Sequence, residues 1–240
     1  MPRLFEELAW GRTPMGEISL RRRHDPTVDT EVYEVKLGDE FLMSSLFTVS
    51  EVELARRGLA PLTGEALDVV VGGLGLGFTA TTVLADPRVR SLLVVEALEE
   101  IIGWHRTGLL PFASALTADD RCRLMHGDFF ARTADPAGYD PDRPGSRAHA
   151  VLADIDHSPR HLVHPAHASF YSTEGLRGLA RHLHPGGVFG LWSNDPPDDE
   201  FLGLLAGVFA TARADVVEFD NPLQRRTAAN TVYLAQTAAP

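Results

Sequence analysis

The sequence Val69-Val-Val-Gly-Gly-Leu-Gly-Leu-Gly-Phe-Thr79 joins a continuous apolar run to three alternating glycines, and a helical pattern follows it. A continuous apolar run is typical of a strand that is buried on both faces of a parallel sheet. Glycine is needed where the next turn is tight and a ligand approaches the backbone closely. Gly73, Gly75 and Gly77 are therefore candidate ligand-binding residues, although a glycine triplet alone is also compatible with a turn that binds nothing.

A carboxylate ends the next apolar run. Glu96 closes the segment Val94-Val95-Glu96 and lies 19 residues beyond Gly77. In a doubly wound sheet this position is at the carboxyl edge of the neighbouring strand, within reach of a ribose. A carboxylate can accept hydrogen bonds from both ribose hydroxyls. The glycine turn and this acid together predict an adenosine-containing ligand more specifically than either feature does alone.

A third candidate lies after residues 123–126, which we expect to form a short strand. There Asp128 stands beside Phe129. The carboxylate could accept the exocyclic amine of adenine while the aromatic ring stacks on the base. The alternative for Asp128 is the N-cap of a helix. The glycine spacing is G-x-G-x-G and not the G-x-G-x-x-G of dinucleotide-binding proteins, which favours a single nucleoside.

Strands and helices alternate in the pattern of residues 63–240. Expected strands occupy residues 67–71, 91–95, 123–126, 148–153 and 188–192, and expected helices occupy residues 78–85, 98–107, 173–183 and 200–212. This alternation predicts an α/β fold with a doubly wound, mostly parallel sheet. Two final strands at 214–219 and 231–234 follow without a helix between them, so we expect an antiparallel hairpin at one edge. Residues 135–147 are rich in Pro, Gly and charge and predict a loop.

Residues 1–62 have a different pattern. Short alternating stretches at 18–22, 31–37 and 40–47 predict antiparallel strands, and residues 50–57 predict a helix. We therefore expect two units, a small N-terminal β-strand domain at 1–62 and a nucleoside-binding domain at 63–240.

Composition excludes several classes of protein. The 240 residues carry a formal net charge of -11 and include one cysteine, Cys122. An acidic surface repels phosphate backbones, so we expect no nucleic-acid partner. A single cysteine forms no disulfide within the chain, which fits the reducing cytoplasm. We expect no signal peptide and no membrane partner, because no basic start precedes an apolar core and no apolar run approaches roughly 20 residues.

These motifs resemble those of the class I S-adenosylmethionine-dependent methyltransferase superfamily, and within it the spermidine synthase-like branch. The matching segments are Gly72–Gly77, Val94–Ile101, Gly127-Asp128, Ala153–Pro159, Phe170-Tyr171 and His184–Val188. The resemblance implies a Rossmann-like, seven-stranded methyltransferase fold behind a small β domain, a sulfonium nucleoside as cofactor, and a homodimer. It also implies that Asp154 contacts the cofactor.

The resemblance places the catalytic loop at Asp154-Ile-Asp156-His157. In aminopropyltransferases this loop has two aspartates three positions apart; here Asp154 matches the first and His157 stands at the second, with Asp156 one residue earlier. Either aspartate could hold a cationic amine, and His157 could accept a proton near neutral pH. The alternative for each residue is a structural contact within the loop.

His157, His161, His164 and His167 follow one another in the same loop. A divalent metal among them and the nearby aspartates is conceivable. Solvent-facing histidines are the more common outcome, and no thiolate or established ligand motif accompanies them. We therefore expect no metal.

Three functions remain open from the sequence. The first is methyl transfer from S-adenosylmethionine to a small acceptor, which could be a cationic amine. The polyamine site of aminopropyltransferases uses a glutamine and a tyrosine–histidine pair. Residues 41–57, which occupy that region here, contain no match for either, and this favours methyl transfer. The second is polyamine synthesis by aminopropyl transfer from decarboxylated S-adenosylmethionine. The third is a nucleoside-binding protein without catalysis.

Overall fold

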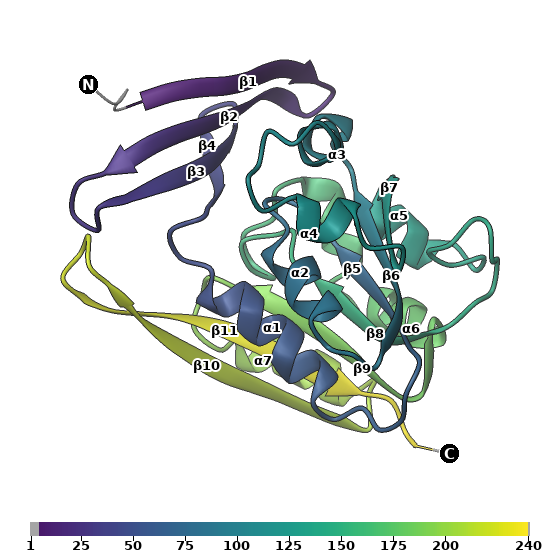
Figure 1. Cartoon of the computed structure of the whole chain (residues 1–240). Helices are drawn as coiled ribbons and strands as arrows, with labels where there is room; N and C mark the ends of the chain where they lie inside the picture. The colour runs from purple at the N-terminus through teal and green to yellow at the C-terminus, as the bar shows by residue number, and fades with distance from the viewer. Residues whose placement is uncertain (1–4, 240) are drawn as a thin grey trace.

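Two β-sheets organise the structure, a computed structural model that describes residues 5–239 (Figure 1). Residues 1–4 of the predicted N-terminal domain, and Pro240, lie outside the described residues. The smaller sheet is antiparallel with the order β1-β2-β3-β4. Its strands are β1 (Phe5–Thr13), β2 (Gly16–Asp25), β3 (Thr30–Leu37) and β4 (Glu40–Ser44).

The larger sheet has seven strands in the order β10-β11-β9-β8-β5-β6-β7. Five neighbouring strands are parallel to one another, namely β9, β8, β5, β6 and β7. The antiparallel hairpin of β11 and β10 completes the sheet beside β9. Its strands are β5 (Leu67–Gly72), β6 (Val89–Glu96), β7 (Cys122–His126), β8 (Ala148–Ala153), β9 (Leu183–Ser193), β10 (Thr211–Asn221) and β11 (Arg226–Gln236). The predicted α/β class, with a mostly parallel seven-stranded sheet and a small N-terminal β unit, is confirmed.

Helices cover both faces of the larger sheet. They are α1 (Val49–Leu59), α2 (Phe78–Leu84), α3 (Glu99–Arg106), α4 (Ser114–Thr117), α5 (Phe129–Ala134), α6 (Thr173–Arg181) and α7 (Asp199–Ala206), with a 3₁₀ turn at Pro165–Ser169. Buried residues of α1 to α4 share one apolar cluster, and those of α5 to α7 share the other. The central strands are apolar along their length because successive side chains enter opposite clusters: Val69 and Val71 face α1 to α4, and Val70 faces α5 to α7.

The strand order reverses at β5. The chain runs from β5 to β6 and β7 on one side, and then returns to β8 and β9 on the other. Loops that leave neighbouring strands in opposite directions open a crevice at the carboxyl edge of the sheet, where ligands bind in open α/β folds. The backbone of Gly73 and that of Asp154 meet at this edge, since Asp154 N donates to Gly72 O at 2.9 Å and Gly73 N donates to Val95 O at 2.9 Å.

Helix α1 connects the small sheet to the large one. In Figure 1 it crosses in front of β9 and β11, and it packs against these strands and against α2. Leu54 on α1 is fully buried and approaches the place where a Cβ at Gly190 of β9 would lie. The division of the chain at residue 62 remains a proposal; α1 lies before that position and packs on the larger sheet.

Some element boundaries differ from those predicted. The last helix ends at Ala206, where Gly207 follows, and the backbone becomes extended from Thr211 onward instead of staying helical to residue 212. The terminal strands are longer than expected, so only residues 222–225 separate them. The sequence pattern missed β1, whose residues are all partly or fully exposed and therefore carry little apolar periodicity, and it missed the short helices α4 and α5.

None of the helices in the described part of the chain is both long enough and apolar enough to cross a bilayer.

Candidate active site

A cavity of about 590 Å³ lies at the carboxyl edge of β5, β6 and β8. The small sheet supplies an apolar wall that includes Val35, Leu37 and Leu42, and the large sheet supplies Gly73, Gly75, Glu96 and Asp154. The cavity is therefore lined by residues that precede α1 in the sequence and by residues that follow it. Low polarity of the wall strengthens any charge interaction made inside.

The glycine turn after β5 forms the floor of this cavity. Gly73 has a φ of 89° and Gly75 a φ of 47°, both in the left-handed region that disfavours other residues. A Cβ on Gly73 would lie 2.2 Å from the carbonyl oxygen of Asp154, and one on Gly75 would lie 2.2 Å from the sulfur of Met43. These two glycines are therefore required by the packing of the chain itself, and the close approach of a ligand stays a prediction; Gly77 caps α2 at a φ of 89°.

Two side chains from other elements form hydrogen bonds to the backbone of this turn. Nε2 of the buried His105 on α3 lies 2.9 Å from Gly75 O, and burial lowers the pKa of this imidazole, so the ring is neutral and Nε2 donates. From the small sheet, Met43 Sδ accepts the Leu76 N–H at 3.0 Å. The glycine turn is thus fixed by one residue from each sheet unit.

Glu96 lies at the end of β6 and lines the cavity. Its Oε2 accepts the Leu74 N–H at 2.8 Å and its Oε1 accepts the Leu98 N–H at 2.9 Å. Burial raises the pKa of this carboxyl, and the backbone N–H groups that it accepts act in the opposite direction. Glu96 therefore sits beside the glycine turn as predicted, and in this structure it also orients that turn. Its contact with a ribose stays a prediction.

A second pair of acids faces the cavity from different elements. Asp154 follows β8, and its Oδ2 accepts the hydroxyl of Thr79 at 2.7 Å. Oδ1 of Asp154 accepts no hydrogen bond from residues 5–239, which leaves this oxygen to a ligand. Glu51 on α1 is 9% exposed and lines the same cavity.

Burial and mutual repulsion shift the pKa values of this pair toward neutrality. Burial raises the pKa of Asp154 to about 6, opposed by the hydrogen bond from Thr79. Burial first and the charge of Asp154 second raise the pKa of Glu51 to about 8. Near neutral pH the pair therefore holds about one proton and one negative charge, and the charge resides mainly on Asp154.

Removing the ionisable group of Glu51 should make stability less dependent on pH. Between a pKa of 4.5 in the unfolded chain and about 8 in the fold, folded protein retains a proton that the unfolded chain has released, so stability falls as pH rises. We expect Glu51→Gln to gain roughly 4 kcal/mol over the original chain between about pH 5 and about pH 9. Urea unfolding at the two pH values measures this gain. The exposed Glu65→Gln is the control, and an equal effect of Glu51→Gln at both pH values would contradict the assignment.

Asp156 lies apart from the cavity. Its side chain is buried and absent from the cavity wall. Oδ1 accepts the Val163 N–H at 2.7 Å and a bond from His167 Nδ1 at 2.8 Å, and Oδ2 accepts the Tyr171 hydroxyl at 2.8 Å. Both oxygens therefore hold the loop after β8, which favours a structural role, and the catalytic role of Asp156 stays a prediction.

Replacement of Asp156 by alanine should therefore affect stability first. The change leaves the buried Tyr171 hydroxyl and the Val163 N–H without an acceptor, at a cost of about 3 kcal/mol in the free energy of unfolding. Chemical denaturation measures this cost. Asp156→Asn, which keeps the shape and one acceptor, should lose less. A variant of full stability without activity would support the catalytic assignment.

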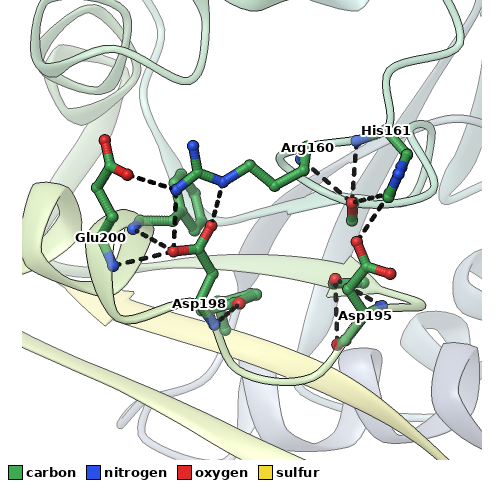
Figure 2. A network of polar contacts seen from close by, with 9 residues as sticks. Arg160, His161, Asp195, Asp198 and Glu200 are labelled. Atoms are coloured by element: carbon green, nitrogen blue, oxygen red, sulfur yellow. Dashed lines mark hydrogen bonds and ion pairs between the residues drawn. The ribbon is translucent and has the colours of Figure 1, made fainter.

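Polar contacts fix the loop after β8 to the small sheet and to the start of α7. His157 Nε2 lies 2.9 Å from Glu40 Oε1 on the small sheet. Figure 2 shows further contacts of this loop: Arg160 binds Asp198 and Glu200 at the start of α7, and His161 binds Asp195. His157 lines the cavity while paired with a carboxylate, and its catalytic role stays a prediction.

The four histidines of this loop have separate partners. His164 Nδ1 accepts the Ala166 N–H, and His167 stacks on Phe130 with ring centroids 3.9 Å apart. Within residues 5–239, no three His, Cys, Asp or Glu side chains are arranged to hold a metal ion.

Phe129 lines the cavity beside Asp128. Its side chain is 2% exposed, stacks on Tyr139 with ring centroids 5.3 Å apart, and fills the space beside Gly72. Its contact with an adenine base stays a prediction. Asp128 is exposed at the cavity wall, where its Oδ1 caps α5 by accepting the Phe130 N–H at 2.8 Å. Its Oδ2 accepts no hydrogen bond from the described residues, so the cap is compatible with a ligand contact.

Three solved structures share this architecture. The crystal structure of spermidine synthase from Thermotoga maritima matches 98% of this chain and 73% of its own, with a TM-score of 0.72 and 15% identity. The chain has the spermidine synthase fold. A spermidine synthase in complex with the transition state analogue AdoDATO matches over 98% and 74% of the two chains (TM-score 0.73, 15% identity). A probable spermidine synthase from Corynebacterium glutamicum matches over 95% and 79% (TM-score 0.65, 16% identity).

No protein-family model and no functionally curated protein matches the sequence. Structural likeness at 15–16% identity establishes the spermidine synthase fold, and one fold can host many reactions. The chemistry of this chain must therefore be argued from its own cavity.

Sequence reasoning missed Glu51, Thr79 and Met43 as site residues. Thr79 lies at the end of the quoted glycine stretch, so its proximity to the turn was a usable signal. Glu51 and Met43 carried no such signal, because their distance from Asp154 and the glycine turn along the chain hides the contact.

Proposed function

We propose that this chain is an aminopropyltransferase, which moves the aminopropyl group of decarboxylated S-adenosylmethionine to an acceptor amine. The observation that carries the proposal is the charge of the cavity. Four acids line it, namely Glu51, Glu96, Asp128 and Asp154, of which Glu51 mainly holds the one proton of the carboxylate pair near neutral pH, and among the described residues no arginine or lysine does. Such a wall attracts sulfonium and ammonium cations and opposes the carboxylate that S-adenosylmethionine retains.

The residues present fit the sulfonium nucleoside. Gly73 and Gly75 line the cavity at the turn after β5, and Glu96 lies against that turn, as a site that grips a ribose requires. These residues would hold the nucleoside, with Asp128 on the adenine side. When bound, the sulfonium supplies an activated carbon and a neutral thioether as leaving group.

The residues of the chain would bind the protonated acceptor amine and take up the proton that it loses. An amine is protonated in water at neutral pH and must be neutral to attack carbon. Asp154 attracts the ammonium form through its free Oδ1, and Thr79 fixes the carboxylate by binding Oδ2. The carboxylate pair can take up the proton that the nitrogen loses, because its members have pKa values on either side of neutrality. The apolar wall from the small sheet excludes water from the reacting groups.

This proposal adopts the second of the three functions left open by the sequence. Methyl transfer was favoured because local motifs of the polyamine site have no match. The spermidine synthase fold of the structural neighbours and the acidic cavity both favour aminopropyl transfer instead.

Titration with the two sulfonium compounds tests the proposal. We expect the decarboxylated compound to bind more tightly by calorimetry, and we expect 5'-methylthioadenosine to be the nucleoside released in the presence of amines. Release of S-adenosylhomocysteine would assign methyl transfer instead. Tight binding of either compound without any turnover across an amine panel would indicate a binding protein.

A further inference from the structure

A second cavity, of about 510 Å³, adjoins the first. Phe47, Glu51 and Trp192 line both, so the two spaces share a wall that contains one acid of the carboxylate pair. Beyond this wall the second cavity is formed by Asn194 after β9 and by the end of the β10–β11 hairpin, where Phe219 packs against Phe47 with ring centroids 5.7 Å apart. An acceptor whose amine lies between Glu51 and Asp154 would extend its other end into this space.

The amide side chains of this second cavity have their oxygen atoms in use. Asn230 Oδ1 accepts from the Ser50 hydroxyl at 3.0 Å, and Asn230 Nδ2 donates to Asn194 Oδ1 at 3.0 Å. Asn221 Oδ1 accepts the Gln224 N–H at 3.0 Å, and Gln224 Oε1 accepts from Arg226 Nε at 2.7 Å. The oxygens of all four amides are therefore engaged.

One donor, in contrast, remains without a partner. Within residues 5–239, Trp192 Nε1 is buried with no hydrogen bond. A buried donor without a partner is rare in native proteins and indicates a missing acceptor. Arg226 is exposed and lines the same cavity, and no described carboxylate lies within ion-pair distance of its guanidinium. A negatively charged group that accepts hydrogen bonds would complement both residues.

We propose that the second cavity binds a carboxylate on the acceptor, so that the substrate is an amino acid that carries the reacting amine and not a simple diamine. The inference rests on the proposed function for the amine end. The two ends of such a molecule match the two ends of the joined cavities, with Glu51 and Asp154 toward the amine and Arg226 toward the carboxylate. A linear diamine would bring only an ammonium to this end, which Arg226 repels, whereas the amino acid brings that ammonium together with a carboxylate, which Arg226 attracts.

Matched acceptors that differ only in a carboxylate test this inference. Ornithine and 1,4-diaminobutane share one skeleton, and so do lysine and 1,5-diaminopentane. We would measure the KM of each with decarboxylated S-adenosylmethionine, and also its dissociation constant by calorimetry in the presence of 5'-methylthioadenosine, a reading that requires no turnover. We expect the amino acid of a pair to bind roughly tenfold more tightly than its diamine.

Variants connect this preference to its donors. Arg226→Ala should abolish the difference within a pair, and Trp192→Phe, which keeps an aromatic ring but loses the N–H, should reduce it. Arg225→Ala is the control, because Arg225 neighbours Arg226 in the hairpin turn and lies outside both cavities.

The two proposals fail in different ways. Turnover of the diamines without a preference for the amino acids, or an equal effect of Arg226→Ala on both members of a pair, overturns the carboxylate site and leaves aminopropyl transfer in place. A preference for amino acids in binding without turnover overturns aminopropyl transfer and supports the carboxylate site. Binding of neither member overturns the carboxylate site.

Discussion

Asp154→Asn should lower turnover by roughly 100-fold to 10,000-fold while the affinity for the nucleoside changes little. Asparagine keeps the size of the side chain and an oxygen for the Thr79 hydroxyl, so the loop after β8 retains its shape. It cannot attract an ammonium ion through a negative charge, and it cannot accept the proton of the attacking amine. Steady-state rates with decarboxylated S-adenosylmethionine, together with calorimetric titration of 5'-methylthioadenosine, separate these two quantities.

Asp156→Asn is the matched control for this experiment. Asp156 lies two residues away and points into the loop, where both oxygens of its carboxylate accept hydrogen bonds. We expect its turnover to stay within a few fold of the original chain. Equal losses of turnover and nucleoside affinity in Asp154→Asn would assign Asp154 to binding, and a larger loss of turnover in Asp156→Asn would reverse the two roles.

Glu96→Ala should reduce the affinity for adenosyl ligands by at least roughly 100-fold, which amounts to loss of binding at ordinary concentrations. Two effects combine. The ribose loses its predicted acceptor, and the buried N–H groups of Leu74 and Leu98 lose theirs, at about 1–3 kcal/mol for each unsatisfied donor. The glycine turn then loses the carboxylate that accepts its backbone N–H group and is no longer held in the same conformation. Calorimetry measures the affinity, and Glu99→Ala, an exposed acid on the following helix, provides the control.

A 2'-deoxy analogue distinguishes these effects. In the original chain, removal of the 2'-hydroxyl should weaken binding, whereas in a Glu96 variant with residual affinity the same removal should change little, because the acceptor is already gone. An equal penalty in both proteins would mean that Glu96 only supports the turn. Unchanged affinity of Glu96→Ala for the complete nucleoside would remove the ribose assignment altogether.

The position of the glycine turn and of Glu96 in the cavity was predictable because the signals for it are local. The glycine turn belongs to one strand–turn–helix unit, and Glu96 ends the next strand, so the sheet register brings Gly72 beside Val95. Short separation along the chain makes such contacts a property of the motif. Asp128 was placed at the cavity wall for the same reason, although the pattern alone did not reveal its cap on α5.

The sequence could not distinguish neighbouring residues between which packing chooses. Asp154 and Asp156 are two positions apart in one loop, yet one faces the cavity and the other the loop interior. Phe129 and Phe130 both line the cavity, but Phe129 is almost completely buried because Gly72 leaves space for its ring. Composition and spacing cannot decide which of two similar side chains turns inward, since that depends on the shape of the space that distant elements leave.

The sequence by itself determined the doubly wound sheet, the glycine turn and the acid beside it, because apolar periodicity and turn chemistry act over a few residues. Only the tertiary structure brought Glu51 of α1 to Asp154 after β8, and set the β10–β11 hairpin beside that pair. The pairing arises because α1 must bury its apolar face on the large sheet, which carries Glu51 to the carboxyl edge. Charge in the cavity, and with it the choice between a methyl and an aminopropyl donor, is therefore a consequence of long-range packing.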